Sequence, residues 1–145
     1  MLQGTKNRDS EQLANELDTN AIEMYVDITQ DYTKIKSTFL NEDFLKTVDI
    51  LSDVIKNSTF NTFEKESRKL KGEIEANLDS PKTKAIDNLI KNIYPDTPYG
   101  HTDTRVLKNL PSLTQESVQD FYKNTLSSDE ICITVVGDIE EDKVK

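Results

Sequence analysis

Residues 22–39 read IEMYVDITQDYTKIKSTF, and this stretch decides the fold class. Its first half places an apolar side chain at every second position: Ile22, Met24, Val26 and Ile28. This period of two is typical of a half-buried strand. Residues 32–39 are again rich in β-forming residues, and a polar pair at positions 30 and 31 separates the halves. The stretch therefore predicts an antiparallel hairpin.

Helical patterns surround this hairpin. A short apolar stripe predicts a helix over residues 10–18, with Asp9 or Ser10 as its N-cap. After the hairpin, Asn41 is expected to cap a helix with the apolar face Phe44, Leu45, Val48, Leu51, Val54 and Ile55. Further helices are predicted over residues 63–78, after the Ser80 and Pro81 start signal, and after Thr114 with Val118, Phe121 and Tyr122 inward. The order predicts an α+β fold in which helices cover an antiparallel sheet.

Two segments complete the reading of the chain. Residues 94–112 contain three prolines and predict a long irregular connection. Residues 131–136 are mostly β-branched and predict a central strand, in which Cys132 would be a small buried side chain. A hairpin and one further strand make a poor sheet, so we expect the missing neighbours outside these residues.

Composition excludes several classes of protein. A net charge of −9 argues against nucleic-acid binding, and the short apolar runs offer no membrane span. One Cys and one His, His101, cannot supply a multi-Cys or multi-His metal site. The single Cys favours a reducing compartment, and the cytoplasm is the favoured location. With 34% hydrophobic residues, the 145 residues resemble one partial domain cut from a larger fold.

Two glutamates on the longest predicted helix are candidates for chemistry. Glu66 and Glu73 are seven residues apart, so they project from one face, and Glu73 borders the apolar stripe. Spacing alone favours a solvated face laced with the pairs Glu64–Arg68 and Lys69–Glu73. His101 is a lone histidine in the predicted irregular connection, so we expect its side chain to be part of the polar surface.

Short motifs in register change the interpretation of these glutamates. They are GTKNR (4–8), EQLANEL (11–17), DYT (31–33), DILSD (49–53), residues 66–74 with 79–81, PYG (98–100), residues 113–114 with 121–122, and VVGD (135–138). Together they resemble the pitrilysin, insulinase and mitochondrial-processing-peptidase family of zinc metallopeptidases, the inverted zincins. The resembling segment is a partial N-terminal-type repeat, expected to be truncated at its N-terminus.

The resemblance implies a role for each glutamate. Family members bind zinc with the two histidines of an H-x-x-E-H motif and a distal glutamate. Glu73 matches that distal ligand, and Glu66 matches an acidic residue that supports the site without binding metal. H-x-x-E-H itself is absent, and Met1 and Leu2 match the residues that follow it. Three explanations are open: a start assigned at an internal Met, a cloned fragment, or a parent among the metal-less members of the family.

The leading hypothesis is a fragment of a zinc metalloendopeptidase that hydrolyses extended peptides inside a two-half chamber. Zinc is expected in the intact parent, and no zinc is expected on this chain alone. This chain is predicted to be inactive and to contain no catalytic residue. The expected partners are an extended peptide and a second peptidase-like half, in the same or another chain. The alternative is a metal-less half that binds substrate or serves a structural role. A third reading is a small acidic adaptor unrelated to proteolysis.

Overall fold

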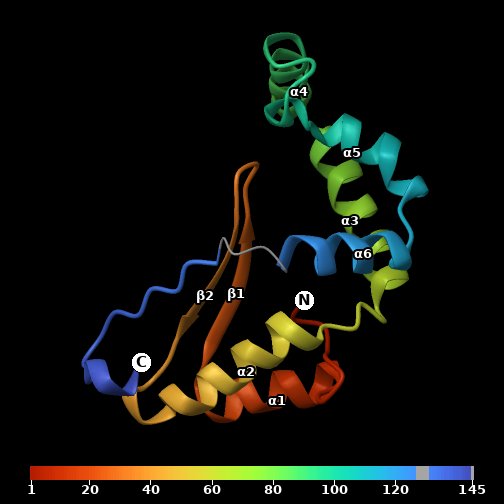
Figure 1. Ribbon diagram of the computed structural model, residues 1–145. Coiled ribbons are helices and arrows are strands. Elements are labelled where there is room, and N and C mark those ends of the chain that lie inside the picture. The colour runs from red at the N-terminus through yellow and green to blue at the C-terminus, as the bar shows by residue number, and fades with distance from the viewer. Residues whose placement is uncertain (127–130, 145) are drawn as a thin grey trace. The chain divides into compact units, whose positions relative to one another are not determined.

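Figure 1 shows the protein in a computed structural model, which describes residues 1–126 and 131–144. These residues form α1 (Ser10–Thr19), β1 (Glu23–Ile28), β2 (Thr33–Thr38), α2 (Phe44–Asn57), α3 (Phe63–Leu78), α4 (Pro81–Ile93), α5 (Asp103–Asn109) and α6 (Gln115–Leu126). Helices with an antiparallel hairpin confirm the predicted α+β class. The chain divides into two compact units, residues 1–60 with the chain from 119 onward, and residues 61–118. None of the described helices is long and apolar enough to cross a membrane.

The hairpin forms as its alternating pattern predicts. β1 and β2 are antiparallel, with Glu23 opposite Thr38 at one end and Ile28 opposite Thr33 at the other. The Thr29 hydroxyl accepts a hydrogen bond from the backbone N–H of Tyr32 at 3.1 Å, which closes the turn. Met24 is half-buried, whereas Ile28 near the turn is exposed. The apolar face is therefore covered only toward the open end of the hairpin.

Local hydrogen bonds fix both ends of α1. Asp9 and Gln12 form a reciprocal capping box at its start. At its end, the N–H of Ala21 donates to the carbonyl of Asp18 at 3.1 Å, and the N–H of Ile22 donates to that of Leu17 at 2.9 Å. This Schellman pattern places Ala21 in the left-handed region, with φ at 49°, and leads the chain directly into β1.

The core of the first unit lies between α1, α2 and the start of β1. Its buried apolar members are Leu13, Ile22, Ile50 and Val54. The predicted face of α2 was partly wrong, because Leu45 is exposed and Ile50 is buried. Buried side chains follow a spacing of about three along the helix, and this spacing includes two polar positions, Thr47 and Asp53. The predicted cap at Asn41 is also wrong, because a short 3-10 helix over Asn41–Asp43 precedes α2 and has no side-chain cap.

In the second unit, α3 and α4 begin and end close to the predicted residues. Ile74 is the buried residue of α3. Ser80 caps α4 through its side chain and Pro81 occupies the first turn, as predicted. Three large apolar residues of α4 are solvent-exposed: Ile86, Leu89 and Ile93.

The predicted irregular connection over residues 94–112 contains a helix that the sequence analysis missed. The Thr102 side chain accepts from the N–H of Arg105 and caps α5, and a buried Asp87 carboxylate accepts from the N–H of Thr104 at 3.2 Å. Gly100, in a 3-10 turn, lies so close to Tyr94 that an added Cβ would stand 1.9 Å from the Tyr94 carbonyl oxygen. The PYG motif therefore has a packing reason for its glycine.

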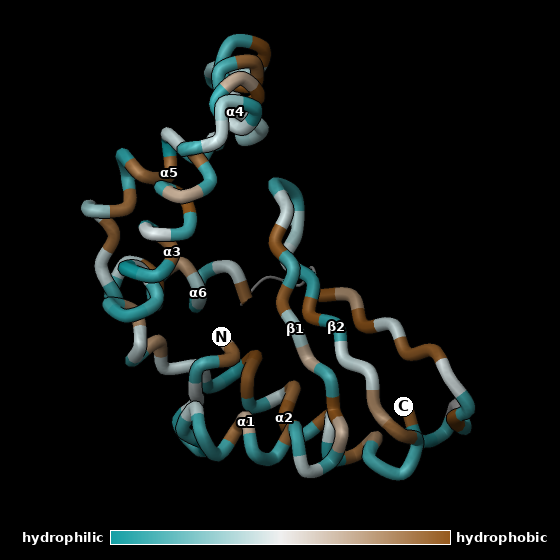
Figure 2. Tube along the Cα trace, turned by 180° about the vertical axis from the view of Figure 1, so that it is seen from behind, coloured by the Kyte–Doolittle hydropathy of each residue, from teal (hydrophilic) through white to brown (hydrophobic). Residues whose placement is uncertain are grey.

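The last predicted strand is wrong. Residues 131–136 have no strand structure, and Val136 is 91% exposed. Cys132 is a free, exposed thiol and not the buried side chain that was predicted. In Figure 2 this segment is the brown-rich stretch that leads to the C-terminus. A strand needs ladder hydrogen bonds from a neighbour, and no described strand supplies them to these residues. In the final helix, Phe121 is exposed and only Tyr122 of the two aromatic residues points inward.

Candidate functional site

The two candidate glutamates lie on α3 as predicted. Glu73 is exposed, with 58% of its side-chain surface accessible, and its Oε1 lies 3.8 Å from Lys69 Nζ. The predicted Lys69–Glu73 pair is thus confirmed. The Glu64–Arg68 ion pair is wrong, since Arg68 Nε donates to the backbone carbonyl of Glu64 at 3.2 Å. An exposed pair at this distance contributes at most about 0.5 kcal/mol, so the Glu73 carboxylate is free to take a stronger partner.

Glu66 has a different environment. It lies in the first turn of α3 and is half-buried, where the positive end of the helix dipole favours a carboxylate. Within residues 1–126 and 131–144, its side chain makes no hydrogen bond or ion pair. A half-buried carboxylate of this kind retains its acceptor sites for a further partner.

The residues present meet the requirement for one zinc ligand and not for a complete site. Zinc in proteins takes three or four protein ligands from Cys, His and carboxylates. In the part of the chain that the structure describes, no three such side chains come close enough to hold a metal ion. His101 follows the 3-10 turn at Pro98–Gly100 and is exposed, which agrees with the prediction that it is part of the polar surface. Of the two candidate glutamates, Glu73 is the more exposed and offers an accessible oxygen donor, and any further ligands would have to come from elsewhere.

The most elaborate polar cluster lies in the first unit, and the sequence analysis missed it. The Asp53 carboxylate, only 5% exposed, accepts four hydrogen bonds of 2.6 to 2.8 Å. Its donors are Thr5 Oγ1, Asn7 Nδ2, Arg8 Nη1 and Asn57 Nδ2. We call this group the Asp53 clamp. Arg8 also donates to Asp49 and Glu16, both at 2.7 Å, so its guanidinium meets three carboxylates.

The clamp strongly favours the ionised carboxylate. Burial raises the pKa of Asp53, but the four donors together outweigh burial and lower the pKa from 3.8 to about 2. The bond to Asp53, ahead of those to Asp49 and Glu16, raises the pKa of Arg8 against the opposing effect of burial. The pair is therefore charged across the whole range in which the protein would function.

One signal in the sequence could have revealed the clamp. Asp53 lies three residues after Ile50 and directly before Val54, so it falls on the buried face of α2. A carboxylate on such a face requires buried donors. The GTKNR motif supplies three of them, from a loop that is 45 to 48 residues away in the chain.

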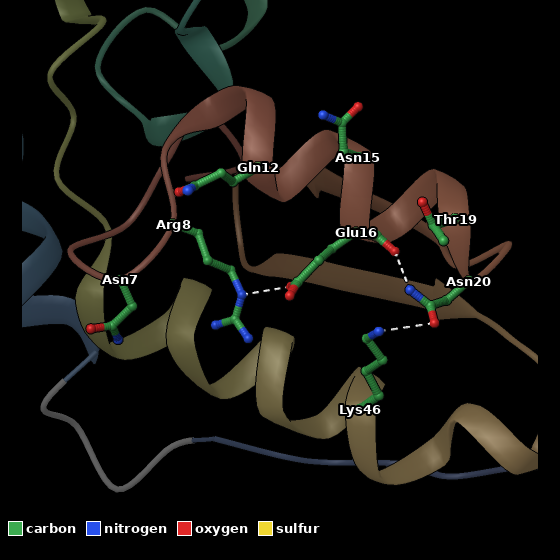
Figure 3. A pocket seen from close by; sticks show the side chains of 8 residues that line it. All are labelled: Asn7, Arg8, Gln12, Asn15, Glu16, Thr19, Asn20 and Lys46. Atoms are coloured by element: carbon green, nitrogen blue, oxygen red, sulfur yellow. Dashed lines mark hydrogen bonds and ion pairs between the residues drawn. The ribbon is translucent and has the colours of Figure 1, made fainter.

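A polar hollow of about 420 Å³ lies beside the clamp, between α1 and α2. Figure 3 shows the side chains that line the hollow. The Glu16 carboxylate accepts a hydrogen bond from Arg8, and the Glu16 backbone carbonyl accepts one from the Asn20 side chain. Lys46 Nζ donates to Asn20 Oδ1 at 2.9 Å and so links α2 to the end of α1. None of the predicted site residues lines this hollow. Its hydrogen bonds connect the two helices and bring together no catalytic set.

Comparison with known proteins identifies the family. The profile of insulinase, peptidase family M16, matches residues 1–104, which include the clamp, Glu66 and Glu73. An uncharacterised zinc protease of Rickettsia felis is 27% identical over 143 residues, which are 97% of this chain and 35% of that protein. The mitochondrial-processing peptidase subunit beta of Saccharomyces cerevisiae is 25% identical, over 97% of this chain and 31% of that protein.

A further relative has a different kind of name. Subunit 1 of the mouse cytochrome b-c1 complex is 22% identical, over 97% of this chain and 30% of that protein. The chain thus spans about a third of the length of these relatives. The matches give no support to the reading of a small acidic adaptor unrelated to proteolysis. The chain belongs to the insulinase family, peptidase family M16.

Proposed function

We propose that this chain is the part of a zinc metalloendopeptidase that contributes Glu73 as one ligand of the metal. The observation that carries the proposal is that Glu73, the residue that the family resemblance matches to the distal ligand, is an exposed carboxylate on α3 whose single ion pair is long and weak. Relatives named zinc protease support a metal in the parent. The remaining ligands would come from an H-x-x-E-H segment before residue 1.

Glu66 would support the site without binding the metal. It is half-buried two turns before Glu73 and keeps its acceptor sites free within the described chain. Mutation of residues that hydrogen-bond to metal ligands, without binding the metal themselves, typically lowers metal affinity 10- to 100-fold. When bound, zinc would polarise the scissile carbonyl and lower the pKa of its water.

The substrate would be an extended peptide, and a second peptidase-like half, in this or another polypeptide, would complete the chamber. An extended peptide can add to the exposed edge of a sheet, and the two-stranded hairpin of the described chain offers such edges. This chain alone, with one ligand, would hydrolyse no peptide.

A second candidate function is a metal-less half that encloses substrate or has a structural role. The relative named as a subunit of the cytochrome b-c1 complex favours it, because that name refers to an assembly and not to a peptidase. The ion pair with Lys69 would then be the whole role of Glu73.

Zinc binding by the natural protein in full, with any sequence that precedes Met1, separates the two candidates. The decisive variant is Glu73→Gln. Glu75→Gln is its matched control, because Glu75 lies on the same helix, is 55% exposed and pairs with Lys71 at the same 3.8 Å. Competition with a chromophoric chelator gives the zinc affinity of each protein.

We expect Glu73→Gln to weaken zinc binding at least 100-fold and to abolish peptide hydrolysis, with Glu75→Gln unchanged. Equal affinities in the two variants would refute Glu73 as a ligand. A wild-type protein that binds no zinc would instead establish the metal-less half.

A further inference from the structure

Residues 131–136, ICITVV, have the sequence of a strand but no strand partner among the described residues. The run is β-branched at every position except Cys132, and it contains no charge, glycine or proline. Ile133 is 75% exposed and Val136 is 91% exposed, and the two lie on opposite faces of an extended run. An uncharged run of this length and composition pairs readily with an open sheet edge.

An open edge of this kind lies in the same compact unit as the run. The described sheet consists of β1 and β2. The N–H of Thr29 donates to the carbonyl of Tyr32 at 3.0 Å, so these residues form a hydrogen-bonded pair of the antiparallel ladder. Such pairs recur at every second position, so the backbone N–H and C=O groups of Thr33, Ile35 and Ser37 point away from β1. The β2 edge therefore presents alternating donors and acceptors to a further strand.

Within one chain, the run and the β2 edge do not pair. In Figures 1 and 2, residues 131–136 run on the β2 side of the hairpin. Among residues 1–126 and 131–144, however, no ladder joins the run to β2. A second copy of the chain supplies what one chain leaves unpaired, because each copy carries one such run and one such edge. Two chains that exchange their runs form a closed two-fold dimer.

Charge distinguishes the β2 edge from the other possible strand partners. β2 carries Lys34 and Lys36 and no acidic residue, whereas β1 carries Glu23 and Asp27 and no basic residue. The run is flanked in the sequence by acidic residues, at positions 129, 130 and 138. Two runs side by side, or a run beside β1, would bring like charges together, and the net charge of −9 already opposes association. Of these partners, β2 offers the opposite charge.

We propose that residues 131–136 of one chain add as a third strand to the β2 edge of a second copy, which returns the same contact. This dimer covers the apolar side chains of the run and brings the acidic residues at its ends toward the two lysines of β2. The β1 edge stays open. The inference concerns self-association and does not depend on Glu73 or on zinc, so the proposed function stands or fails separately.

The test compares the mass of the 145-residue chain in solution with the masses of two variants and their controls. Ile133→Pro with Thr134→Pro removes one N–H from each side of the run, and Ile133→Val with Thr134→Val is its control, because valine keeps both N–H groups. Lys34→Glu with Lys36→Glu reverses the charge of β2. Lys82→Glu with Lys84→Glu is its control, because these exposed lysines on α4 have the same spacing and give the same change in net charge.

Sedimentation velocity from about 1 to 100 µM, which spans moderate to weak affinities, gives the mass and the dimer dissociation constant. We expect the wild type and both controls to form dimers, and the proline variant to stay monomeric throughout. The variant with glutamates in β2 should dimerise at least tenfold more weakly, and this difference should shrink at high salt. Hydrogen exchange of the Ile35 amide, which faces the open edge, should be slow in the dimer and fast in the proline variant. The Lys36 amide, which faces β1, should not change.

Four results would overturn the inference. A wild type that is monomeric at every concentration shows no self-association, and slow exchange of the Ile35 amide in that monomer shows that the run pairs within its own chain. A dimer that persists in the proline variant uses another surface. Equal dissociation constants for the two lysine variants show that β2 is not the acceptor. A wild type that forms species larger than a dimer contradicts the reciprocal exchange.

Discussion

Replacement of Asp53 by Asn tests how much the clamp contributes to the stability of the first unit. The amide is isosteric with the carboxylate, so packing in α2 is retained. It carries no charge, and its nitrogen cannot accept the hydrogen bonds that Oδ1 and Oδ2 now share. Thr5 and Asn7 lose their charged acceptor, and the guanidinium of Arg8 loses one of its three carboxylate partners.

The magnitude follows from the pKa of Asp53. A fall from 3.8 to about 2 corresponds to about 2.5 kcal/mol of stability at neutral pH, at about 1.4 kcal/mol for each pKa unit. Removal of one member of a buried ion pair typically costs about 3 to 5 kcal/mol, because the remaining charge stays buried. Arg8 keeps Asp49 and Glu16, so we expect the lower end, about 2.5 to 3 kcal/mol.

The pH dependence has a definite sign. Folding lowers the pKa of Asp53, so its contribution is complete above the unfolded value of 3.8 and is lost as the pH falls through the folded value of about 2. The difference in the free energy of unfolding between wild type and Asp53→Asn should be constant from pH 7 to pH 5. By pH 3 it should shrink by about 1 kcal/mol.

Urea unfolding followed by far-UV circular dichroism at pH 7, 5, 4 and 3 gives these differences. Hydrogen exchange of the Lys6 amide, which donates to Asn57, reports on the loop locally. Asp49→Asn is the control, because Asp49 binds the same arginine at 2.7 Å but is 70% exposed, and its loss should cost under about 1 kcal/mol. A cost below 1 kcal/mol for Asp53→Asn, equal costs for the two variants, or a difference that does not change by pH 3 would refute the reasoning.

Three further predictions concern packing and backbone, each measured by urea unfolding. Ala21→Gly should stabilise the protein by about 1 kcal/mol, because glycine adopts the φ of 49° without strain; a destabilised variant would contradict this. Thr47→Val should also stabilise it by about 1 kcal/mol, because the buried Thr47 hydroxyl has no hydrogen-bond partner among the described residues; a loss of stability would reveal a hidden partner. Gly100→Ala should lower the free energy of unfolding by about 1 to 3 kcal/mol, because the added methyl group clashes with the Tyr94 carbonyl. Gly72→Ala, in open space on α3, should raise it by about 1 kcal/mol. Equal effects of the two substitutions would disprove the packing argument.

Patterns with a local physical cause could be predicted from the sequence. The alternation around Met24 defines the hairpin, and the bounds of α3 and the Ser80 cap of α4 follow from periodicity and capping. The helix α5 was missed because prolines on both sides of it suggested an irregular loop. Its cap, Thr102, is a local signal, but the buried Asp87 that holds its first turn comes from another helix.

In the candidate site, too, residues identified by local patterns could be predicted, whereas contacts between distant residues could not. Glu66 and Glu73 could be identified because seven residues separate them on one helix and their motif resembles a known family. The Asp53 clamp could not be assembled in advance, because its donors are up to 48 residues from the carboxylate and only folding brings them together.

By itself, the sequence determined the α+β class, the hairpin, the long helix with its two glutamates, and the acidic character of the chain. These features depend on neighbours within one or two turns or one strand pair. The tertiary structure decided which face of α2 is buried, that residues 131–136 form no strand, and that one carboxylate joins the N-terminal loop to the exit of α2. Each of these depends on partners distant in the chain, whose positions local periodicity does not encode.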